Sequence, residues 1–289
     1  MKKSILAALA AAVACVSSPA MPAAALRFGN EAADTTRINA ILVDAVGRDI
    51  ASPQERTAYV ARLFEGVPYA AHTLEGSPEQ LTVRLDSLDC TTFVETALAL
   101  AYTAGERRSS WRDFVYNLER LRYRGGHMDG YGSRLHYNCD WAQDNMHRGL
   151  IADVTPRIPR TSYIVRSIDF MSRHADRYPA LADSAALEAV KKVESGYRLH
   201  RFPYIRTADL RFRDVQDALR TGDVVALVTK LKDLDVTHLG IIVKDADGVP
   251  HLLHASLSAG RVVLSDPPLA DFMKRNTGLL GVRVYRLLD

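Results

Sequence analysis

Cys90, His238 and His254 have the residue types and the surroundings that nucleophilic catalysis requires. Cys90 stands where a loop becomes an amphipathic helix, and the positive end of the helix dipole is expected to favour its thiolate and lower its pKa. His238 begins a segment rich in valine and isoleucine and is the candidate base for Cys90. His254 lies on the following segment and is the candidate partner that orients His238. The pattern predicts a Cys-His-His arrangement, with the backbone N–H of Cys90 as one oxyanion donor.

The positions of the two histidines around a turn support this arrangement. Asp247-Gly248 is a hairpin signal, and His238 and His254 lie at roughly similar distances on either side of it. They are therefore expected to be neighbours across two paired strands. His251 and His254 are three residues apart, so on a strand they would point to opposite faces and could not readily bind one metal ion. We expect neither a metal nor a cofactor.

The same residues also have a structural interpretation. Cys90 and Cys139 are the cysteines that remain outside the N-terminal segment, and in an oxidising compartment they could form a disulfide. A single histidine is more often a structural residue than a catalytic one. The joint placement of Cys90, His238 and His254 favours catalysis.

The elements that must position these side chains begin with helices. Apolar residues recur at helical spacing from Ile38 to Val46, from Pro53 to Gly66, after Asp89 and from about Ser110. The helix after Asp89 has an apolar face broad enough to be the buried central helix.

The last third of the chain predicts strands instead. Short segments rich in valine, isoleucine and leucine, separated by turns, cover residues 223–229, 237–244, 251–257, 261–264 and 280–287. Their connections are too short for parallel crossovers, so we expect an antiparallel sheet. Helices followed by strands predict an α+β domain, with N-terminal helices packed on a C-terminal sheet.

The first residues have the three parts of a secretory signal peptide. Lys2 and Lys3 precede an apolar run, which ends in Ala23-Ala24-Ala25. Cleavage after Ala25 predicts an exported, periplasmic protein in which residues 26–289 form a single domain. The alternative is a loose lipoprotein signal, which would attach a lipid anchor at Cys15.

Composition excludes other classes of protein. The 37 basic and 34 acidic residues give a net charge of +3, which is too small for binding a nucleic-acid backbone. No second apolar stretch is long enough to be a transmembrane span. The motifs G-x-S-x-G, S-x-x-K, H-E-x-x-H and the P-loop are absent from the sequence, which argues against the enzymes that carry them.

Several segments resemble the NlpC-type papain-like cell-wall hydrolases in the order in which they occur. They are Gly66-Val67-Pro68-Tyr69, Leu88-Asp89-Cys90-Thr91-Thr92-Phe93, Gly222-Asp223-Val224, His238-Leu239-Gly240-Ile241 and His254-Ala255-Ser256. Five further segments are similar to the branch described as N-acetylmuramoyl-L-alanine amidase-like: Asp89 to Glu95, Ser133 to Tyr137, Asp140-Trp141, Leu234 to His238 and Pro267-Pro268-Leu269.

The resemblance implies that Cys90 is the nucleophile, His238 the general base and His254 the orienting residue. It also suggests that Tyr69 lies near the oxyanion or the substrate, although a half-buried turn aromatic is an equal alternative. Asp89 either contacts the substrate or caps the helix.

This branch is expected to hydrolyse the amide between the muramic acid lactyl group and L-alanine, in peptidoglycan or its soluble fragments. The wider superfamily mostly cuts between D-glutamate and the diamino acid, so that endopeptidase activity is an alternative. A non-enzymic envelope-binding protein with a Cys90 to Cys139 disulfide is another.

The segment from Gly125 to Asn145 is the candidate substrate-binding loop. It is rich in glycine, tyrosine, histidine and aspartate without helical or strand periodicity. The residues that could bind sugar and peptide groups are Arg134, His136, Tyr137, Asp140 and Trp141. Plain loop packing, with an Arg-Asp pair and a buried tryptophan, is the alternative.

Overall fold

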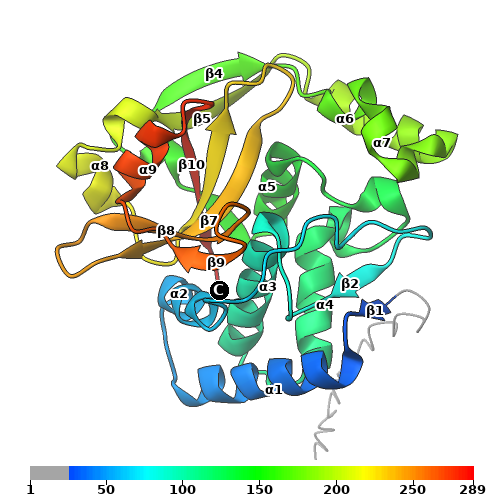
Figure 1. Cartoon of the computed structure of the whole chain (residues 1–289), viewed down its shortest axis with the longest axis horizontal. Coiled ribbons are helices and arrows are strands. Elements are labelled where there is room, and N and C mark those ends of the chain that lie inside the picture. Colours follow the sequence, from blue (N-terminus) through cyan, green and yellow to red (C-terminus); the bar gives the residue numbers. More distant parts are fainter. Residues whose placement is uncertain (1–25) are drawn as a thin grey trace, which may run out of the picture.

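The computed structural model describes residues 26–289 and shows an α+β structure, as predicted (Figure 1). The predicted signal peptide and Cys15 lie outside the described residues. Within residues 26–289, no helix has the length and apolar character needed to cross a membrane.

The four predicted N-terminal helices are present. The helices α1, α2, α3 and α4 cover Glu31–Gly47, Pro53–Arg62, Cys90–Gly105 and Trp111–Arg122. Each begins after a polar residue whose side chain accepts a backbone N–H: Asn30, Ser52, Asp89 and Ser110. Helix α3 packs against α1, α2, α4 and the sheet, which confirms the prediction of a buried central helix.

The predicted strands form one antiparallel sheet. The strands β6, β7, β8, β9 and β10 cover Val224–Thr229, Val236–Lys244, Pro250–Ser256, Arg261–Leu264 and Leu279–Leu287, each within one residue of its predicted bounds. The strands β3, β4 and β5, at Ile151–Asp153, Ser162–Arg166 and His200–Arg206, were not predicted. The sheet order is β4-β5-β10-β6-β7-β8-β9, with β3 paired to β10. A separate parallel pair joins β1 (Leu26–Phe28) to β2 (Leu81–Val83).

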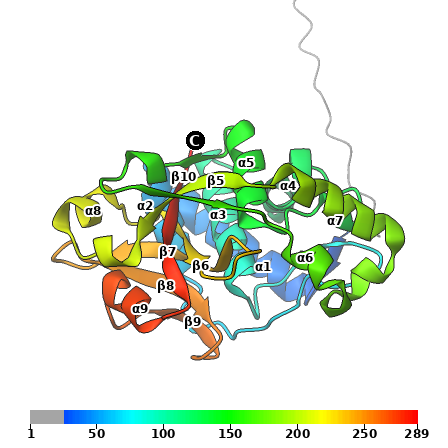
Figure 2. The same ribbon diagram turned by 90° about the horizontal axis from the view of Figure 1, so that it is seen from above.

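The two faces of the sheet pack against different helices. Leu239 and Ile241 of β7 belong to the core cluster shared with α1 to α4. Ile242 faces the other way and packs in a second cluster with α8 (Arg213–Ala218) and α9 (Leu269–Arg275). Figures 1 and 2 both place α8 and α9 together at one end of the molecule. Strand β7 therefore lies between two cores.

The predicted loop from Gly125 to Asn145 contains a helix, which corrects the sequence analysis. Helix α5 covers Asn138–His147, and its first turn contacts a third apolar cluster that includes α6 (Phe170–Arg173) and α7 (Ser184–Gly196). The helix has no clear apolar period because several of its buried residues are polar and hydrogen-bonded. Figures 1 and 2 place α6 and α7 at the end opposite α8 and α9.

Candidate active site

Cys90 is the first residue of α3, and the residue before it fixes the start of the helix. The side chain of Asp89 accepts the backbone N–H of Thr92 at 2.8 Å, while the hydroxyl of Thr92 accepts the backbone N–H of Asp89 at 2.9 Å. This reciprocal capping box holds the first turn in place. Of the two roles considered for Asp89, the structure supports helix capping.

His238 and His254 are hydrogen-bonded to each other. The distance between His238 Nε2 and His254 Nδ1 is 2.7 Å, and the two rings are perpendicular. Continuing the register from Ile241 paired with Leu253 places His254 opposite Gly240, so the two histidines are diagonal neighbours on β7 and β8. A Cβ at Gly240 would lie 2.6 Å from the side chain of Leu252, so glycine permits the close approach of these strands.

Cys90 and His238 line the same cavity, which has a volume of about 130 Å³. Its walls come from the start of α3, the first turn of α5 with the residues before it, and the segment that leads into β7. Within residues 26–289, Nδ1 of His238 has no hydrogen-bond partner, whereas Nε2 is bonded to His254. A proton on Nε2 leaves the Nδ1 lone pair available to accept a proton inside this cavity.

The expected lowering of the Cys90 pKa is wrong for this structure. Burial, together with the neighbouring Asp89 carboxylate, raises the pKa of Cys90 to about 11, although hydrogen bonds from Leu239 and Thr91 act in the opposite direction. Loss of hydration therefore outweighs the hydrogen bonds that favour the thiolate. Burial and the adjacent His254 lower the pKa of His238 to about 3, and burial lowers that of His254 to about 4. At neutral pH the resting site holds a thiol and two neutral imidazoles.

Tyr69 lies close to Cys90 and is partly buried. Its backbone N–H donates to Gly260 O at 2.8 Å, which ties the segment before α3 to the turn between β8 and β9. Burial, with the Cys90 and Asp89 charges nearby, raises the pKa of its hydroxyl. The phenol is thus a neutral hydrogen-bond donor beside the thiol.

Two of the five candidate substrate-binding residues of the predicted loop also line the cavity. His136 Nε2 lies 2.9 Å from Tyr131 O, and burial lowers the pKa of His136 to about 3. Trp141 packs edge-on against Tyr285, with ring centroids 6.0 Å apart. Its indole N–H is buried without an acceptor among residues 26–289.

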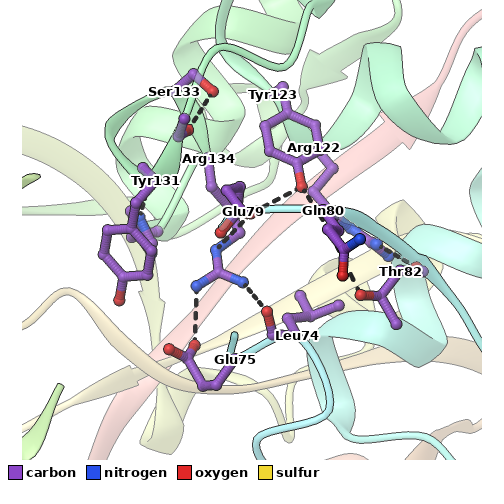
Figure 3. Close-up of polar contacts among 12 residues, drawn as sticks. Leu74, Glu75, Glu79, Gln80, Thr82, Arg122, Tyr123, Tyr131, Ser133 and Arg134 are labelled. Atoms are coloured by element: carbon purple, nitrogen blue, oxygen red, sulfur yellow. Dashed lines mark hydrogen bonds and ion pairs between the residues drawn. The ribbon is translucent and has the colours of Figure 1, made fainter. Parts of the chain in front are cut away.

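Arg134 lies in a buried polar network and does not line the cavity (Figure 3). Of its two predicted roles, the structure supports loop packing. Its side chain is only 5% exposed, donates to Leu74 O and Glu75 Oε1 at 2.8 Å each, and lies 3.6 Å from Glu79. Its guanidinium also covers the ring of Tyr131. These contacts leave little of the guanidinium for a ligand.

Tyr137 and Asp140 are structural as well. The hydroxyl of Tyr137 donates to Glu194 at 2.7 Å and accepts the N–H of Met171, which joins α5 to α6 and α7. Asp140 forms a two-point ion pair with Arg124 at 2.9 and 2.6 Å. Neither residue lines the cavity.

Cys139 and Cys90 are both free thiols, and Cys139 is buried. The alternative disulfide between them is therefore absent from this structure. The backbone N–H of Cys139 donates to Asp235 at 2.5 Å. Burial and Asp235 raise the pKa of the Cys139 thiol.

The cavity wall also contains an amide and two carboxyl groups that were not candidate site residues in the sequence analysis: Asn138, Glu95 and Asp235. Glu95 is paired with Arg122 at 2.6 Å, and Asn138 accepts the Tyr285 hydroxyl at 2.7 Å while its Nδ2 has no partner among the described residues. Glu95 and Asp235 lie within two of the segments that resemble the amidase-like branch, and that resemblance was the available signal for them.

Comparison with known proteins bears on the identity of this site. A family model described as AmiA-like, N-acetylmuramoyl-L-alanine amidase-like, matches residues 59–279. No curated protein sequence matches the chain significantly.

Several solved structures share the fold. An N-acetylmuramoyl-L-alanine amidase from Bacteroides uniformis is 36% identical with a TM-score of 0.76, covering 82% of this chain and 99% of its own. A protein from Bacteroides fragilis described as a putative xylanase is 37% identical with a TM-score of 0.74, covering 79% and 100%. A Legionella pneumophila protein, 23% identical with a TM-score of 0.69 over 90% and 97%, shows the fold alone.

Proposed function

Because the chain belongs to the N-acetylmuramoyl-L-alanine amidase-like family, we propose that it is an exported cysteine amidase of the NlpC-type papain-like fold. Its substrate is peptidoglycan or a soluble fragment of it. The bond it hydrolyses is the amide between the muramic acid lactyl group and L-alanine. Cys90 is the nucleophile, His238 the general base and His254 the orienting residue.

The observation that carries this proposal is the 2.7 Å hydrogen bond between His238 Nε2 and His254 Nδ1, beside a cavity that Cys90 shares. The bond fixes the tautomer and the orientation of His238. Burial lowers the pKa of His238 to about 3, so its ring is neutral in the resting site and its Nδ1 carries a lone pair.

The reaction then follows acyl transfer through a thioester. As Sγ of Cys90 attacks the lactyl carbonyl carbon, its proton moves to Nδ1 of His238, and the carbonyl oxygen becomes an oxyanion. The Cys90 N–H and the Tyr69 hydroxyl are the candidate donors to that oxyanion. His238 passes the proton to the alanine nitrogen, the C–N bond breaks, and the peptide leaves as an amine. Water, deprotonated by His238, hydrolyses the thioester and restores the thiol.

The charges around the cavity favour the lactyl–alanine bond over the D-glutamyl bond. None of the described residues that line it is a lysine or an arginine, and its wall contains the carboxyl group of Asp235 and that of Glu95, which Arg122 already pairs at 2.6 Å. A D-glutamyl acyl group would bring a free carboxylate next to these groups without a cation to pair with it. A muramoyl acyl group is uncharged.

Digestion of purified muropeptides, followed by mass spectrometry, tests the choice of bond. The amidase releases the intact stem peptide with a free alanine amine and leaves the sugar with a free lactyl carboxylate. A dipeptide that remains on the sugar would show that the enzyme is the endopeptidase instead.

Export is part of the proposal, and processing of the expressed precursor tests it. Cleavage after Ala25 gives a periplasmic protein that begins at Leu26. A mature protein that begins at Cys15 and carries acyl chains would show that the lipoprotein alternative is correct.

A further inference from the structure

A groove of about 790 Å³ reaches His254 between β9 and α9. Its walls include Arg261, Phe272 and Arg275, and the ring of Phe272 packs edge-on against His254 with centroids 5.3 Å apart. The groove is about six times as large as the cavity of Cys90. It therefore has room for several residues of an extended ligand.

The groove and the cavity each reach one member of the histidine pair, and no described residue lines both spaces. His254 lines the groove, His238 lines the cavity, and the two rings share the 2.7 Å hydrogen bond. The wall of the groove is also bonded to the segment that carries Tyr69: Gly66 N donates to Val262 O at 2.9 Å, and Val262 N donates to Val67 O at 2.8 Å. A ligand that occupies both spaces crosses the catalytic residues.

Arg261, Arg275 and Asp266 are the charged residues of the described groove wall that have no partner. The two arginines are exposed, and neither makes an ion pair or a side-chain hydrogen bond within residues 26–289. Glu65 also lines the groove, but it is paired with Arg62 at 3.0 Å. Asp266 is the one remaining acid of the described wall, so the unpaired charges leave an excess of one positive charge.

We propose that Arg261 and Arg275 bind the free carboxylates of the stem peptide, which is the leaving group of the proposed reaction. This inference rests on the proposed function. A peptide that contains D-glutamate and a diamino acid carries free carboxylates, and a guanidinium matches a carboxylate with two parallel N–H donors. The arginines thus bind the charged peptide that leaves. The cavity, whose described wall has no cation, receives the uncharged muramoyl acyl group.

A pair of matched substrates tests this assignment in the intact mature protein. One is a soluble muramoyl peptide with free stem carboxylates, and the other is the same compound with those carboxylates converted to carboxamides. We expect wild-type kcat/KM to be about tenfold or more higher for the acid form. We expect the Arg261→Gln, Arg275→Gln double variant to lose this preference, because its kcat/KM should fall for the acid form and stay unchanged for the carboxamide form.

Arg198→Gln is the matched control, because Arg198 is also exposed and without an ion pair among the described residues but lies outside the groove. It should leave both substrates unaffected. Arg261→Lys with Arg275→Lys should restore part of the preference, since the charge is kept and the two-point geometry is lost. Equal wild-type rates on both substrates, or an equal loss on both in the Gln variant, would overturn the assignment.

Equilibrium binding separates this proposal from the proposed function. Free stem peptide and its carboxamide form are titrated into Cys90→Ala protein with and without the two Arg→Gln changes. Preferential binding of the acid form that disappears with the arginines supports the groove assignment, even if no turnover is found. Failure to bind the acid form preferentially refutes the groove assignment, even if the amidase activity is confirmed.

Discussion

The cavity that holds Cys90 and the groove beside His254 differ in size and charge, although each reaches one member of the histidine pair. The cavity, at about 130 Å³, has room for about four water molecules, and none of its described lining residues is basic. The groove, at about 790 Å³, has two arginines without partners. The difference is what the proposed reaction requires, since a muramoyl–peptide amide joins an uncharged acyl group to an anionic leaving group.

Removing the nucleophile should have the largest effect, because it should abolish catalysis in the cavity and leave peptide binding in the groove unchanged. Cys90→Ala should lower kcat by at least about 10⁴-fold, because no other thiol lines the cavity to form the thioester. Binding of free stem peptide in the groove should be unchanged within about twofold, as measured by calorimetry. Residual turnover near the wild-type rate would remove Cys90 from the mechanism, and an unchanged melting temperature is the control for folding.

Changing the histidine of the groove that is bonded to His238 should have the next largest effect. His254→Ala removes the acceptor of the His238 Nε2 proton and should lower kcat by about 10² to 10³-fold. His254→Asn places an amide oxygen near the position of Nδ1, so it should recover activity to within about tenfold of wild type. Steady-state kinetics of the two variants checks this. Equal activity in both would mean that the hydrogen bond does not position His238.

The protonation state of Cys90 in the cavity can be measured by alkylation. Because its pKa is raised to about 11, the thiolate fraction and the rate of reaction with iodoacetamide should rise about tenfold per pH unit from about pH 6 to pH 10. The Cys90→Ala protein gives the background from buried Cys139. A rate that is already constant above about pH 5 would instead indicate a preformed thiolate–imidazolium pair.

The smallest expected effect concerns the acyl side of the cavity. The indole N–H of Trp141 is buried without an acceptor, which costs about 1–3 kcal/mol unless a ligand oxygen accepts it. Trp141→Phe should lower kcat/KM for the muramoyl substrate about tenfold and leave the affinity for free stem peptide unchanged. Trp111→Phe is the matched control, since Trp111 packs on Phe28 and does not line the cavity. If both variants behave alike, the indole donor has no role in binding.

Local sequence patterns were enough to predict the framework of the site. The period of three to four residues after Asp89 predicted α3, and the Asp247-Gly248 turn predicted the hairpin that pairs β7 with β8. These signals are local, because a helix cap or a tight turn is determined by a few adjacent residues.

The side chains of the binding segment could not be assigned in the same way. Asn138 and Trp141 are three residues apart on α5 and both line the cavity, whereas Tyr137 and Asp140 face Glu194 and Arg124. The orientation of α5 depends on contacts with distant segments, which composition does not reveal. The raised pKa of Cys90 was missed for a related reason, because its burial depends on packing against β7.

The position of β10 bears on how the chain is made. This strand is the last of the sheet along the sequence, yet it lies between β5 and β6, and a chain that stops before residue 279 leaves both with unpaired edges. The sheet therefore cannot be completed during synthesis until its C-terminal strand emerges. A chain of this design lacks one internal strand of its sheet until nearly all of it has been synthesised.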